Sequence, residues 1–154
     1  MKDNESPKAR RDRELGELLQ ELRVALPGVQ VLFAFLLTVP FTQRFASLDH
    51  SQRRVYFAAV LAAAVSSLLL IAPAANHRLL FREGVKEAML KAANKVAIAG
   101  LMVLALGIGL SLYLVTTMVY ETETAIFVSI GIGLMTLFAW FVFPRLLKED
   151  ERRD

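Results

Sequence analysis

The chain has 154 residues, of which 55% are hydrophobic, and it carries 18 Lys and Arg against 15 Asp and Glu. It contains no cysteine, which excludes disulfides, thiolate nucleophiles and cysteine-based metal sites. The formal net charge of +3 does not indicate a nucleic-acid partner, because the basic residues lie at the ends of apolar runs and are not interleaved with aromatic residues.

Four uncharged apolar runs divide the chain, and each has at least 20 residues. A helix needs about 20 apolar residues to cross a hydrocarbon core of about 30 Å. We therefore predict an all-α integral membrane four-helix bundle with an N-terminal amphipathic lead-in helix. The predicted spans are residues 24–43, 55–76, 94–119 and 124–146, within one domain at 14–147. Residues 1–13 are predicted to be a disordered tail and residues 148–154 a second tail.

The basic residues are distributed unevenly among the segments outside the runs. Fifteen of them lie in the N-terminal tail, the middle loop and the C-terminal tail. Only Arg44, Arg53 and Arg54 lie in the other two loops. Because cytoplasmic loops carry the excess of Lys and Arg, we expect both termini in the cytoplasm.

A leucine stripe precedes the first span and has the spacing of one helix face. The stripe consists of Leu15, Leu18, Leu19, Leu22 and Leu26. We expect this lead-in helix to lie at the membrane surface. Pro27 and Gly28 follow it, and proline disfavours helix at the residue before it and lacks a backbone donor. We therefore expect a bend at Pro27 between the lead-in helix and the first span.

The middle loop, residues 76–95, is predicted to be mostly helical, with a break at Gly84. The two loops on the opposite side are short. The second of them is so short that the third and fourth spans must form a tight hairpin.

The membrane interior carries no Asp, Glu, His, Lys or Arg at mid-depth. Ion-coupled carriers need an ionisable group there, so its absence disfavours ion-coupled transport. Gln30 lies about six residues inside the first span, and its amide must find polar partners. It makes either a hydrogen bond between helices or a polar site on the cytoplasmic half.

Five residues are expected near one depth at the cytoplasmic rim, and we treat them as the candidate site. They are Arg23, Gln30, His77, Arg78 and Arg82. The arginines at 78 and 82 lie one turn apart, which suits a phosphate-bearing lipid head group or a cytoplasmic anion. Ordinary positive-inside anchoring accounts for the same residues and stays open as the alternative.

The third and fourth spans each contain a pair of glycines in the same four-residue sequence. These are Gly107 and Gly109 in the third span, and Gly131 and Gly133 in the fourth. We expect them to allow two thin helix faces to cross closely. The alternative is a broken helix at a substrate site, as in transporters.

The chain has no glycine-rich phosphate loop, no metal-binding spacing of His, Asp and Glu, and no arrangement of a nucleophile beside a base. We therefore predict no enzyme activity, no cofactor and no metal.

Two stretches carry a resemblance. They are residues 17–24 (ELLQELRV) running into 28–41 (GVQVLFAFLLTVPF), and residues 72–78 (APAANHR) with 81–82 (FR). They resemble a family of small four-span membrane proteins of unknown function, mainly actinobacterial. Some members of that family bear an automatic sodium:proton antiporter label. The resemblance covers about residues 14–147 and implies the four-span fold in a bacterial plasma membrane, without an established activity.

We interpret the chain as a non-enzymatic, multi-pass structural or interaction protein with a basic cytoplasmic face. The alternative is a small oligomeric transporter or channel, which the lack of an intramembrane carboxylate disfavours. The expected partners are membrane lipids. A cytoplasmic or membrane protein partner and self-association stay open.

Overall fold

The computed structural model describes residues 6–80 and 86–150. Within these residues every regular element is helical. In chain order the elements are α1 (Pro7–Thr38), η1 (Val39–Phe41), α2 (Gln43–Ala46), α3 (His50–Leu80), α4 (Lys86–Thr117), α5 (Thr122–Leu137), the π-helical turn η2 (Phe138–Val142) and α6 (Phe143–Asp150). Four helical stretches are long and apolar enough to cross a membrane, which confirms the predicted all-α four-helix membrane fold.

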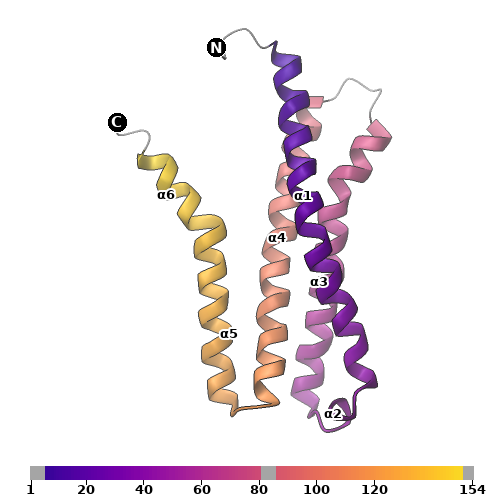
Figure 1. The fold of residues 1–154 in the computed structure, drawn as a ribbon, viewed down its shortest axis with the longest axis vertical. Helices are drawn as coiled ribbons and strands as arrows, with labels where there is room; N and C mark the ends of the chain where they lie inside the picture. Colours follow the sequence, from indigo (N-terminus) through magenta and orange to yellow (C-terminus); the bar gives the residue numbers. More distant parts are fainter. Residues whose placement is uncertain (1–5, 81–85, 151–154) are drawn as a thin grey trace.

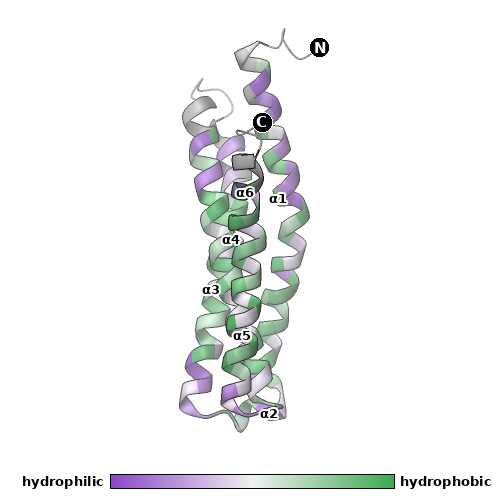
Figure 2. Ribbon diagram, turned by 90° about the vertical axis from the view of Figure 1, so that its left-hand side faces the viewer, coloured by the Kyte–Doolittle hydropathy of each residue, from purple (hydrophilic) through white to green (hydrophobic). Residues whose placement is uncertain are grey.

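The start of α1 and the end of α6 lie at one end of the bundle, which we call the terminal end (Figure 1). The opposite end, which carries α2 and the turn between α4 and α5, is the loop end. Hydrophobic residues fill the middle of the helices and hydrophilic residues gather at both ends (Figure 2). This banding is the pattern expected of helices that cross a bilayer.

Three of the long helices exceed the thickness of a hydrocarbon core. Helices α1 and α4 have 32 residues each and α3 has 31. At 1.5 Å per residue, 32 residues span about 48 Å, against a hydrocarbon core of about 30 Å. The charged first part of α1 lies at the terminal end, so the three helices extend beyond the hydrocarbon core on that side.

Helix α1 corrects two of the sequence-based predictions. Residues 7–13 were expected to be disordered, but α1 begins at Pro7, and Ser6 caps it by accepting a hydrogen bond from the Ala9 backbone N–H at 3.2 Å. Serine at the N-cap and proline at the first helical position are both favoured starts. Pro27 was expected to bend the chain, but the helix continues through it to Thr38. The lead-in segment is therefore the first half of the same helix and does not lie apart on the membrane surface.

Four residues at seven-residue intervals explain why α1 stays continuous. Leu15, Leu22, Val29 and Leu36 are all buried, and they lie on one face on both sides of Pro27. A seven-residue repeat is the period of helices that pack along a shared seam. Proline removes one backbone hydrogen bond, whereas breaking the helix would expose several of these apolar side chains.

Helices α3 and α4 share the largest interface in the described part of the chain. On both helices the buried residues recur at alternating steps of three and four residues. On α3 the buried series is Tyr56, Ala59, Ala63, Ser66 and Leu70. On α4 it is Ala93, Ala97, Gly100, Leu104, Gly107 and Leu114. Small residues dominate both series, as expected where helices associate in lipid by close backbone contact.

The tightest point of this interface is Gly100. A Cβ atom added there would lie 2.8 Å from Leu70 Cδ2 and 3.2 Å from Leu69 Cβ. The buried Ser66 hydroxyl donates a hydrogen bond to the Gly100 carbonyl oxygen at 2.9 Å. Packing therefore favours glycine here, and the hydrogen bond to its backbone carbonyl holds the two helices together at the same point. The sequence analysis did not single it out.

The loop end is held by a small set of polar contacts. The buried Tyr56 hydroxyl donates to the Leu36 carbonyl oxygen at 3.0 Å, which ties the end of α1 to the start of α3. The Phe45 ring meets the Tyr56 ring edge-on at 5.1 Å between centroids. Arg53 donates to the carbonyl oxygens of Leu48 and Ala46 and closes the turn before α3.

Helix α5 is attached on one side only. Among the described residues it packs against α4 and touches neither α1 nor α3. In Figure 1, α5 and α6 lean away from α4 toward the terminal end. The helix widens into η2, where the Phe143 N–H bonds back to the Phe138 carbonyl oxygen. Pro144 has no N–H to donate, and a wider turn accommodates it. The helical path continues to Asp150, into the predicted 148–154 tail.

The predicted middle loop is helical on both sides, since α3 runs to Leu80 and α4 begins at Lys86. The expected break at Gly84 lies outside the described residues.

The Gly100 contact yields a paired test. Gly100→Ala forces Leu70 or the helix backbone to move, and we expect a loss of about 1–3 kcal/mol in the free energy of unfolding. Gly109→Ala is the matched control, because a Cβ there meets no atom within 4 Å. We expect that change to be neutral or stabilising by up to about 1 kcal/mol. Denaturant titration of both purified variants measures the difference, and equal stabilities would contradict the packing described here.

The continuity of α1 can be measured by spin-label distances, because the chain has no native cysteine. Labels at Gly16→Cys and Thr38→Cys are 22 residues apart, which gives about 33 Å along an unbroken helix. A right-angle bend at Pro27 would shorten this to about 23 Å. The pair Lys95→Cys and Thr117→Cys on α4 has the same separation without an intervening proline. We expect the two pairs to give similar distances; a much shorter distance on α1 would contradict a continuous helix.

Candidate functional site

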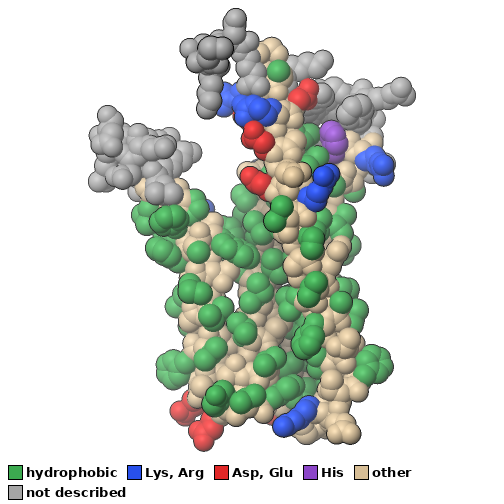
Figure 3. All heavy atoms as spheres, in the orientation of Figure 1, with side chains coloured by type: hydrophobic (Ala, Val, Ile, Leu, Met, Phe, Trp, Pro, Cys, Tyr) green, Lys and Arg blue, Asp and Glu red, His purple; other side chains and the backbone are tan. Residues whose placement is uncertain are grey.

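A groove runs between α1 and α3 at the terminal end, and we call it the α1–α3 groove. It has a volume of about 880 Å³ and mixes polar and apolar lining. Its polar lining consists of Arg23, Gln30, His77 and Arg78. Figure 3 shows charged side chains gathered at both ends of the molecule with a hydrophobic band between them. The groove therefore lies where the charged end meets the hydrophobic band.

Helical spacing brings the lining residues together. On α1 the groove residues Arg23, Leu26, Pro27 and Gln30 recur at steps of three and four, so they share one face. On α3, residues 70, 74 and 77 form one such row, and residues 71, 75 and 78 form the row beside it. Each helix thus presents one continuous strip to the groove.

The groove has an apolar floor and open walls. Leu22 and Leu70 are buried at the floor, and both belong to the core cluster that joins α1, α3 and α4. Ala74 and Ala75 are exposed, and because their side chains are small, the side of the groove formed by α3 is shallow. The groove is therefore open to the surroundings of the bundle along its length.

Pro27 adds a backbone acceptor to the polar lining. Proline has no N–H, so the Arg23 carbonyl oxygen loses the donor that residue 27 would supply in a regular helix. A carbonyl group without its helical partner needs another donor. Both residues line the groove, so this acceptor belongs to the same local environment.

Four of the five residues predicted for the rim line this one groove. The fifth, Arg82, lies outside the described residues. The side chain of Gln30 is exposed, and its expected hydrogen bond to another helix is not found among the described residues. Of the two alternatives for Gln30, its position favours a polar site. The sequence analysis missed Leu70 and the alanine pair Ala74 and Ala75, although the pair lies one turn before His77 and Arg78.

The predicted glycine packing is only partly present. A Cβ added to Gly107 would lie 3.4 Å from the Ala62 Cβ, so this glycine lies close to α3. A Cβ added to Gly109, Gly131 or Gly133 would meet no atom within 4 Å. The close crossing expected between the two glycine pairs is therefore not observed. The reason is that α5 stands off from α4 beside these residues.

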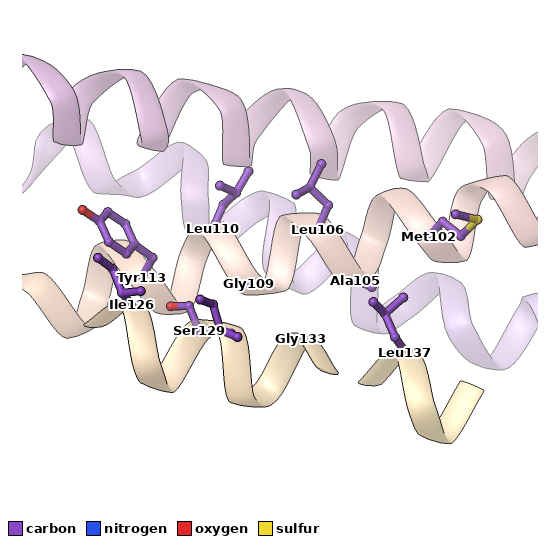
Figure 4. A pocket seen from close by; sticks show the side chains of 11 residues that line it. Met102, Ala105, Leu106, Gly109, Leu110, Tyr113, Ile126, Ser129, Gly133 and Leu137 are labelled. Carbon is purple, nitrogen blue, oxygen red and sulfur yellow. The ribbon is translucent and has the colours of Figure 1, made fainter. Parts of the chain in front are cut away.

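The space beside these glycines is a second groove, between α4 and α5, with a volume of about 390 Å³. Figure 4 shows Gly109 and Gly133 on the two helices, between larger side chains such as Leu106 and Leu137. The lining is almost wholly apolar. Its polar groups are those of Tyr113 and Ser129, and the buried Ser129 hydroxyl has no hydrogen-bond partner in the structure.

A third groove lies between α1 and α4 toward the loop end. It has a volume of about 490 Å³ and an apolar lining in which Arg44 is the single charged residue among those described. The α1–α3 groove is distinguished from both others by its several converging polar groups. No set of three His, Asp or Glu side chains in residues 6–80 and 86–150 is placed to hold a metal ion.

The fold and the groove define the chain as a small helical membrane protein with a basic groove at one end of the bundle. A family model described as a family of unknown function (DUF6328) matches residues 4–144, and the chain belongs to this family. This agrees with the predicted membership in a family without established activity. No curated protein and no solved structure matches the chain.

Proposed function

We propose that this protein acts by binding, as a non-enzymatic structural or interaction protein of a bacterial plasma membrane. The proposed orientation places the terminal end in the cytoplasm, because fifteen of the 18 basic residues lie in the tails and middle loop. The α1–α3 groove and the helical extension around it then face the cytoplasmic leaflet and the cytoplasm.

The observation that carries this proposal is the apolar seam at the centre of the bundle. Among the described residues, Ser66 is the one polar side chain buried in this seam, and its hydroxyl donates to the Gly100 carbonyl oxygen. Leu22, Val29 and Leu70 fill the seam beside it. A path for ions needs polar or ionisable groups along its length, and this seam offers none beyond one satisfied hydroxyl.

The extension beyond the membrane supports an interaction role. Leu15 is buried there, so the extension is packed and not a loose tail. On its exposed side, Arg10 pairs with Glu14 at 2.8 Å and Arg13 with Glu17 at 2.9 Å, each four residues apart on the same helix. Such pairs stabilise the helix that carries them by about 0.2–0.5 kcal/mol each. The result is an ordered, charged surface at the terminal end.

A small oligomeric transporter is the second candidate, and the groove between α4 and α5 is the observation in its favour. The groove reaches the hydrophobic band, and the Ser129 hydroxyl in it has no protein partner. Two neutral polar side chains in an otherwise apolar lining support ion passage poorly. The binding role therefore remains the better supported of the two.

Flux measurements test the proposal. We expect proteoliposomes holding the protein to pass protons, sodium and a cationic dye no faster than protein-free liposomes. The reason is the lack of ionisable groups at mid-depth. Gln30→Leu and His77→Ala should leave this background unchanged. Saturable flux that requires the protein and falls in either variant would contradict the binding role and support the transporter.

A further inference from the structure

We propose that the α1–α3 groove is a binding site for an anionic glycerophospholipid of the surrounding leaflet. Its phosphate lies between Arg23 and Arg78, and an acyl chain lies along the apolar floor. This inference rests on the proposed binding role and names the ligand class of that site.

Charge is the first argument. Both guanidinium groups stay charged at any physiological pH and match phosphate oxygens with paired donors. Among the described residues that line the groove, none is acidic. Glu14 and Glu17 pair with Arg10 and Arg13 on their own helix. The groove thus holds positive charge that its own lining does not neutralise, and a basic groove between membrane helices suits an anionic head group.

The direction of the helices is the second argument. Side chains on a helix lean toward its N-terminus. The N-terminus of α1 is at the terminal end and that of α3 is at the loop end, so the two helices are antiparallel (Figure 1). Gln30 therefore leans up over Leu26 and Pro27, and Arg78 leans down over Ala74 and Ala75. By this rule the Gln30 and Arg78 side chains are directed toward the same stretch of groove from opposite ends, and Arg23 is directed toward Leu19 at the terminal edge of the groove.

The third argument is that the groove changes character along its length. Arg23 and Gln30 are seven residues apart, about 10 Å along α1. The charged groups lie toward the terminal end, whereas Leu70 and Ile71 line the deeper apolar part, beside Val29 of α1. A lipid has the same sequence of groups: a charged phosphate, polar ester linkages and then an apolar chain. The Gln30 amide lies between the charged part and the apolar part of the groove, where it donates to the ester oxygens of the lipid.

Access is the fourth argument. Pro27, Ile71, Ala74 and Ala75 are exposed, so the groove opens sideways toward the leaflet. A lipid therefore enters from the membrane without leaving its apolar surroundings. A free inorganic anion offers the same phosphate chemistry but leaves the apolar floor without a ligand. For this reason we commit to a lipid as the occupant.

Retention of defined lipids by the purified protein tests the inference. The protein is mixed with phosphatidylglycerol or phosphatidylcholine of identical chains, and bound lipid is counted by native mass spectrometry. We expect retention of phosphatidylglycerol at least tenfold tighter than that of phosphatidylcholine. The double variant Arg23→Gln with Arg78→Gln should lose this preference, because both charge-assisted contacts to the phosphate are removed.

Two further variants separate the groove from general charge effects. Arg44→Gln removes the single charged residue of the loop-end groove and should leave phosphatidylglycerol retention unchanged. Ala75→Trp fills the groove without altering charge, at an exposed position that tolerates a larger side chain. We expect it to reduce retention at least tenfold while the unfolding midpoint stays near that of the parent.

Each alternative result has a distinct meaning. Equal losses in Arg44→Gln and in the double variant would overturn the site, as would equal retention of the two lipids. Displacement of phosphatidylglycerol by inorganic phosphate at equal concentration would show a free-anion site and overturn the lipid assignment. Absent flux together with absent lipid retention would reject this inference and leave the binding role standing. Flux with selective retention would reject the binding role alone.

Discussion

The close approach of α3 and α4 at Gly100 is the contact on which the rest of the bundle depends. Leu70 packs directly over this glycine, and Ser66 bonds to its carbonyl oxygen. Leu70 belongs to the same buried cluster as Leu22 and Val29 of α1, so the position of α1 depends on the same contact. In lipid, where apolar surface alone does not drive helices together, such backbone proximity supplies the association energy. One glycine thus sets both the helix pair and the surface on which α1 lies.

The α1–α3 groove follows from that arrangement. Leu22 and Val29 pack α1 against the core. Ala74 and Ala75 on α3 have small side chains, so the space beside α1 at this level is left open as the groove. Leu70 is common to both, since it fills the core and forms the floor of the groove. The groove is therefore built by helix packing and not by a flexible loop, and its polar groups stand on two helices, α1 and α3. Helix α5 has no part in it and stays free to contact lipid or another protein.

The four spans could be predicted from the sequence because long uncharged runs are a strong signal, whereas the function of the rim residues stays a prediction. Four of the five residues predicted for the rim line one groove, because helical spacing brings them to facing sides of α1 and α3, although Arg23 and Gln30 lie about 10 Å apart along α1. The expected bend at Pro27 was wrong because a local preference was overruled by the seven-residue seam on either side of it. Gly100 could not be identified from the sequence, because its role depends on Leu70, which lies across the interface on α3.

The measurement that tests the account most directly is the distance between arginine nitrogens and lipid phosphorus in a bilayer. Solid-state NMR of ¹⁵N-labelled protein in phosphatidylglycerol detects this proximity through nitrogen–phosphorus dipolar coupling. The signals assigned to Arg23 and Arg78 by substitution should show strong coupling, clearly above that of Arg53, whose guanidinium is bonded to backbone carbonyls. Equal coupling at all arginines, or none at Arg23 and Arg78, would contradict a phosphate held in the groove.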